Sequence, residues 1–192
     1  PYRLMVLDVN EGLTPGNDRP VAGDDIRPTH SIAQCRDDPV DGHPTRFDAL
    51  ILKGNMRHLR PTLYDLLAHR AINYFENNER DIKKPTYAFE INQASAFDPA
   101  ADFVTRKFPT KDSLSLEHKA LLIYQKLIAL HLRDSNPDAL IDADLLRIAF
   151  VKGKSTHPDK DQLYFNSINH IANQYHNNTA AAQAWYLLAQ YN

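Results

Sequence analysis

The chain has 192 residues, a net charge of −2 at neutral pH and a single cysteine, Cys35. A chain of this length can bury a hydrophobic core without disulfides, and one cysteine excludes both an internal disulfide and a cysteine-based metal cage. The 22 basic and 24 acidic residues form no concentrated basic run, so we expect no nucleic-acid partner. No apolar run approaches the roughly 20 residues of a bilayer span, so we expect no direct membrane insertion.

Glycine and proline divide the chain into two parts. Four of the six glycines and six of the twelve prolines lie in the first 44 residues, which disfavours long regular elements there. We therefore predict an irregular, loop-rich segment over residues 1–45 and an α-helical domain over residues 46–192. Because the chain begins with Pro1 and not with methionine, we expect it to be a piece of a longer protein.

The helical part begins with two predicted helices. A short apolar run over residues 47–52 ends near Gly54, a typical helix-terminating residue. In the next helix Thr62 is a good N-cap, Asp65 can complete a capping box, and the helix should end near Asn77. Its apolar residues recur with helical spacing, which predicts a buried stripe of Leu63, Leu66, Leu67, Ala71, Tyr74 and Phe75.

The pattern weakens over residues 84–109. Tyr87, Phe89 and Ile91 alternate with other residues as in a strand. Asp98 and Pro99 are typical of the N-cap and first position of a helix, here a short one that contains Phe103.

Four longer helices complete the prediction. Ser115 should cap a helix to Arg133, whose apolar residues nearly encircle it and make it central. Asn136 and Pro137 should open a helix that ends at Gly153, followed by helices over residues 161–176 and, capped by Thr179, over residues 180–191. The sequence thus predicts a mainly α protein of antiparallel helix hairpins, stacked as in tetratricopeptide repeats.

The residues predict no reaction centre. No two of the nine histidines are three or four positions apart, so no helix presents paired metal ligands, and we expect no metal or cofactor. His69 is expected to be a structural residue at a helix contact. The triplet His157, Pro158 and Asp159 also occurs in J domains of Hsp70 co-chaperones, but the preceding helix lacks their basic surface, so an ordinary turn is expected. A hydrolase using a His/Asp pair is the enzyme alternative.

Five runs resemble the helical region of α2-macroglobulin-like proteins of Bacteroidetes. The longest is LRPTLYDLLAHRAINYF at residues 59–75. The others keep the same order: IYQKL at 123–127, HLRD at 131–134, ALIDADLLR at 139–147 and AWYLLAQY at 184–191. The resemblance covers roughly residues 45–192 and leaves the first 45 unassigned.

The resemblance implies a function without catalysis. Members of this family are envelope-associated or secreted protease traps, in which cleavage of a bait segment collapses the molecule and, in many, a Cys-Gln thioester captures the protease. Cys35 lacks the glycine and glutamine context of a thioester, so that role is not transferred to it. The resemblance implies a structural or interaction domain that contacts neighbouring domains of its parent chain or a protein partner. The alternative is a stand-alone tetratricopeptide-like module that binds a peptide.

Overall fold

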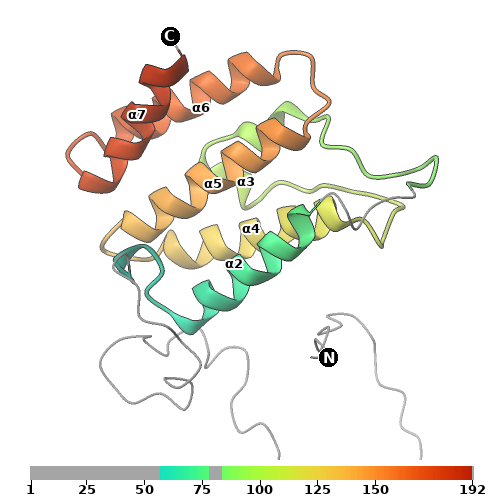
Figure 1. The fold of residues 1–192 in the computed structure, drawn as a ribbon, viewed down its shortest axis with the longest axis horizontal. Helices are drawn as coiled ribbons and strands as arrows, with labels where there is room; N and C mark the ends of the chain where they lie inside the picture. Colours follow the sequence, from blue (N-terminus) through green and yellow to red (C-terminus); the bar gives the residue numbers. More distant parts are fainter. Residues whose placement is uncertain (1–56, 78–83, 192) are drawn as a thin grey trace, which may run out of the picture.

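The computed structural model describes residues 57–77 and 84–191 (Figure 1). The predicted irregular segment over residues 1–45 and the short helix over residues 47–52 lie outside these ranges. The described part is mainly helical and contains no strand. Its elements are η1 (Arg57–Leu59), α2 (Leu63–Glu76), η3 (Ala94–Phe97), α3 (Ala100–Phe103), α4 (Leu116–His131), α5 (Asp138–Lys154), α6 (Lys160–Gln174), η4 (Thr179–Ala181) and α7 (Ala182–Tyr191).

The five longer helices pack in chain order. α2 lies along α4, α4 along α5, α5 along α6 and α6 along α7, and successive long helices run in opposite directions (Figure 1). The predicted mainly α fold of antiparallel helix hairpins is therefore confirmed. Their stacking in the manner of tetratricopeptide repeats stays a prediction.

Two predicted helix starts are confirmed by their caps. Thr62 Oγ1 accepts a hydrogen bond from Asp65 N at 3.2 Å, and Thr62 N donates to Asp65 Oδ2 at 2.7 Å, which completes the capping box of α2. Ser115 Oγ accepts from His118 N at 3.2 Å at the start of α4. Such caps stabilise a helix by about 1 kcal/mol because they satisfy amide groups that the helix leaves unpaired.

Other helix ends differ slightly from the prediction. α3 and α5 begin just after Pro99 and Pro137, so each proline occupies the cap position and not the first helical position. Gly153 does not end α5, which continues to Lys154 and is capped by Ser155. Before α7, Asn178 and not Thr179 provides the capping side chain, since its Oδ1 accepts from Ala180 N at 2.7 Å.

The predicted strand around Ile91 is wrong. Phe89 and Ile91 are buried, whereas Tyr87 is 60 % exposed, and the segment has no partner strand among the described residues. Its one ladder contact is an isolated parallel bridge between Ile91 and Ser155. Phe89 and Ile91 pack into a core made largely by helices. An extended segment that covers such a core buries every second side chain, as a strand in a sheet does.

The buried face of α2 also differs from the predicted stripe. Leu67 is 52 % exposed and Tyr74 is 37 % exposed, although both belong to that stripe. Leu63 is buried as predicted, and the other buried residues of α2 lie outside the predicted stripe and include two polar ones: Asp65, Ala68, His69 and Ile72. An apolar pattern alone cannot predict this face, because Asp65 is buried against a partner from another helix.

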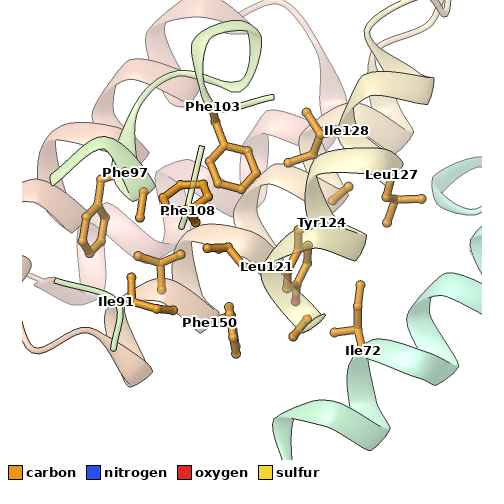
Figure 2. Close-up of a cluster of buried hydrophobic side chains, with 14 of the residues drawn as sticks. Ile72, Ile91, Phe97, Phe103, Phe108, Leu121, Tyr124, Leu127, Ile128 and Phe150 are labelled. Carbon is orange, nitrogen blue, oxygen red and sulfur yellow. The ribbon is translucent and has the colours of Figure 1, made fainter. Parts of the chain in front are cut away.

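Two hydrophobic clusters form the core. In the first, side chains of α4 lie between Ile72 of α2 and the phenylalanines of the segment before α4 (Figure 2). The second lies among α5, α6 and α7 and consists of Ile141, Leu145, Ile148, Ile168, Ile171, Ala172, Ala184 and Leu188. α5 contributes buried side chains to both clusters, so α4 is central to the first cluster only, and α5 joins the two.

Candidate functional site

Among the described residues, a cluster of buried and half-exposed ionisable groups lies where the start of α2 meets the end of α4 and the first half of α5. We call it the polar cluster: Arg60, Asp65, His69, His131, Asp134 and Asp142. Its centre is the side chain of His131, which is 2 % exposed. His131 Nε2 lies 2.6 Å from Asp65 Oδ1, and Nδ1 lies 2.7 Å from Asp134 Oδ2. Two carboxylate acceptors require a proton on each ring nitrogen, so His131 is an imidazolium.

Hydrogen bonds outweigh burial for the central pair. Burial opposes the charge of His131, yet its bonds to Asp65 and Asp134 raise the pKa of the imidazole above its ordinary value. Burial likewise opposes ionisation of Asp65, but the bonds from His131 and Thr62 lower the pKa of the carboxyl. The pair therefore ties α2 to α4 with a buried, charge-assisted hydrogen bond.

For the other two buried members of the polar cluster, burial outweighs the neighbouring opposite charges. His69 is 6 % exposed, and burial, assisted by the positive charge of Arg60, lowers its pKa to about 4, so the ring is neutral at neutral pH. Burial raises the pKa of Asp142. Asp142 Oδ2 lies 3.5 Å from Arg60 Nε, and among the described residues it is the one buried side-chain oxygen or nitrogen without a hydrogen-bond partner.

A second buried charge lies in α5. Arg147 is fully buried, and its Nε donates to Asp144 Oδ1 at 3.0 Å. Its Nη1 donates to Ala96 O and its Nη2 to Asp98 O, so one guanidinium joins α5 to the segment that contains η3. Arg147 Cζ also lies 4.4 Å from the centre of the Phe103 ring. Sequence reasoning missed this residue; the available signal was the Asp144/Arg147 pair, three positions apart and therefore on one side of α5.

A hollow of about 270 Å³ lies beside Arg147, between η3 and α6. Phe97, Pro99, Leu163 and Ile171 provide much of its lining. Its buried cation is already bound, as described for Arg147, and Ser167 Oγ donates to Phe97 O at 2.8 Å. Asp98, Asn166 and His170 also line it, so the hollow presents polar groups beside its apolar wall.

The triplet at residues 157–159 forms the expected turn. His157 Nδ1 accepts a hydrogen bond from Asp159 N at 3.1 Å, and Lys160 N donates to His157 O at 3.2 Å. α6 begins at Lys160, immediately after this turn. These bonds account for the local conformation of His157 without a partner protein.

Over residues 57–77 and 84–191, no group of three or more His, Cys, Asp or Glu side chains is placed to hold a metal ion. None of the helices in those ranges has the length and apolar content that a membrane crossing requires. No protein-family model matches the chain, and searches of curated proteins and of solved structures give no match.

The bonds of His131 predict a pH dependence on the alkaline side. The pKa of His131 is higher in the folded chain than in the unfolded chain. The stabilisation by its bonds is therefore complete below the unfolded pKa of about 6.5 and is lost as pH rises through the folded pKa. We expect the free energy of unfolding, from urea titrations, to fall as pH rises above about 6.5. The fall should be smaller in His131→Gln and unchanged in His170→Gln, where the histidine is exposed. An equal slope in His131→Gln would contradict the assignment.

Proposed function

We propose that this chain is a non-catalytic helical structural and interaction domain. The observation that supports it is that two buried cationic side chains, Arg147 and His131, are bonded to other parts of the same fold. Arg147 binds the carbonyls of Ala96 and Asp98, and His131 binds Asp65. A general base must reach a proton of the substrate, whereas both nitrogens of His131 are engaged and its side chain is 2 % exposed.

The more specific proposal is that the domain belongs to a large α2-macroglobulin-like protease-trapping protein of the cell envelope. Its support is the resemblance of five runs in the same order. The longest run coincides with α2 and its capping box, and the last coincides with α7. In this proposal the partners are neighbouring domains of the parent chain or another protein.

We assign the contact surface for such partners to α7. Trp185, Tyr186 and Tyr191 are 46 %, 61 % and 42 % exposed, and α7 carries no charged residue. Aromatic residues with few neighbouring charges are typical of protein interfaces.

Two experiments test this proposal. The parent gene should encode β-sandwich domains on the same polypeptide. A parent gene without such domains would contradict the family assignment. Isothermal titration of the chain with the adjacent β-sandwich domain should give saturable binding, weakened roughly tenfold or more by Trp185→Ser combined with Tyr186→Ser. The control is Leu114→Ser, since Leu114 is 77 % exposed and lies outside α7. Binding that both variants retain equally would exclude α7 as the interface.

Catalysis has its own test. The unsubstituted chain should hydrolyse neither a peptide nor an ester substrate. Hydrolysis that His131→Gln or His157→Gln abolishes would overturn the proposal of a non-catalytic domain.

A further inference from the structure

We propose that the hollow beside Arg147 binds a small aromatic group that carries one neutral N–H or O–H donor, and that Asp144 accepts the hydrogen bond from this donor. The inference goes beyond the proposed function and does not depend on it, since the surface assigned there to partners is α7. It rests on the shape and size of the hollow, on one carboxylate oxygen without a partner and on the balance of charges around it.

The hollow has a buried floor and an exposed rim. Asp144, Arg147 and Ile148 are buried residues of α5 at positions i, i+3 and i+4, so they share one side of that helix and form the floor. Phe97 of η3 and Ile171 of α6 are buried wall residues. Four exposed residues line the rim: Ala94, Pro99, Asn166 and His170. A ligand can therefore enter from solvent and bury its apolar part between η3 and α6.

The size of the hollow suits one aromatic group. Its volume is about 270 Å³, and an apolar cavity of about 150 Å³ is sufficient to bind benzene. The hollow therefore has room for two fused rings, such as those of indole. Burial of the rings against Phe97, Leu163 and Ile171 supplies the apolar part of the binding energy.

One oxygen of Asp144 is available to such a ligand. The two hydrogen bonds from Arg147, donated by Nε and Nη2, both end on Asp144 Oδ1. The described residues give Oδ2 no hydrogen bond, and the one fully buried side-chain oxygen or nitrogen without a partner among them belongs to Asp142. Asp144 Oδ2 is therefore accessible. Because the whole residue is only 4 % exposed and lines the hollow, this oxygen is accessible from the hollow.

The charges around the hollow favour a neutral donor over a cation. Asp144 is paired with Arg147, and Asp98 is paired with Arg106, whose Nη2 lies 2.6 Å from Asp98 Oδ2. Each carboxylate that lines the hollow thus already has its cation. An ammonium group would lose its hydration without meeting a net negative charge, whereas a neutral N–H or O–H loses less and still bonds to Asp144 Oδ2.

Titration of the ¹⁵N-labelled full chain with indole, followed by amide chemical shifts, tests this assignment. Indole should shift resonances of residues that line the hollow, among them Phe97, Ser167 and Ile171, and the shifts should saturate with a Kd of about 1 mM or lower. Benzothiophene has nearly the same shape and no N–H. It should bind about fivefold more weakly or worse, because Asp144 Oδ2 then loses water without gaining a donor.

The variant Asp144→Asn identifies the acceptor. Its amide oxygen can still accept from Arg147, while its NH₂ group replaces Oδ2 by a donor. The affinity for indole should fall to that for benzothiophene, and the affinity for benzothiophene should not change. Asp102→Asn is the matched control, since Asp102 is exposed and outside the hollow, and should leave both affinities unchanged. If Asp144→Asn does not fold, the ratio of the two affinities in the unsubstituted chain decides.

Two further probes define the ligand. Benzyl alcohol should bind more tightly than benzylammonium, which has a similar size and a positive charge. N-acetyltryptophanamide distinguishes the sources of an indole group: affinity equal to that of indole indicates a tryptophan side chain of a partner, and exclusion indicates a free small molecule.

Three results would overturn the proposal. Shifts that do not saturate, or that spread over all helices, would exclude the hollow as a site. Equal affinities for indole and benzothiophene would exclude Asp144 as the acceptor. Tighter binding of benzylammonium than of benzyl alcohol would exclude a neutral ligand.

Discussion

Replacing Arg147 with methionine should lower the free energy of unfolding by about 3–5 kcal/mol. The substitution leaves Asp144, which is 4 % exposed, without its cationic partner in a buried site. It also removes the donors to the carbonyls of Ala96 and Asp98, so the segment before α4 loses two of its bonds to α5. Unpaired buried charges and acceptors cost far more than exposed ones because no water replaces the lost bond.

Urea denaturation followed by circular dichroism measures this loss. The double variant Arg147→Met with Asp144→Leu should recover much of it, since it removes both charges and leaves none unpaired. The exposed Arg133→Met should stay within about 0.5 kcal/mol of the parent chain. A loss below about 1 kcal/mol in Arg147→Met, or no recovery in the double variant, would show that the buried pair does not hold this part of the fold.

Phe103→Ala should lower the free energy of unfolding by a similar amount, about 3–5 kcal/mol. Phe103 is 0 % exposed in the first hydrophobic cluster, and its ring centre lies 5.8 Å from that of Phe108. The loss combines the transfer of an aromatic ring from the core with the cavity that remains. It also removes the ring on which the guanidinium of Arg147 rests.

The same urea titrations measure the Phe103 effect. Tyr186→Ala is the control, because Tyr186 is 61 % exposed and its removal should change stability by about 0.5 kcal/mol or less. The effects of Phe103→Ala and Arg147→Met should be less than additive, since the two side chains are in contact. Strict additivity would mean that the contact contributes nothing.

Features that depend on near neighbours in the chain were predictable. Thr62 and Asp65 are three residues apart, as are Ser115 and His118, so each cap is complete within one helical turn. The mainly α fold followed in the same way, because no glycine lies between Gly54 and Gly153 and neither glycine nor proline follows Pro158. These features were visible in the sequence because the interactions that produce them are local.

Features that depend on distant residues were not predictable. Asp65 is buried on α2 because His131, 66 positions away, bonds to it, and this pairing exposes Leu67 instead. Arg147 of α5 can be buried because the carbonyl of Ala96, 51 positions away, accepts a hydrogen bond from its guanidinium. A buried charge is tolerated only where the folded chain places a partner beside it. The order of the amino acids does not directly show which residues become such partners.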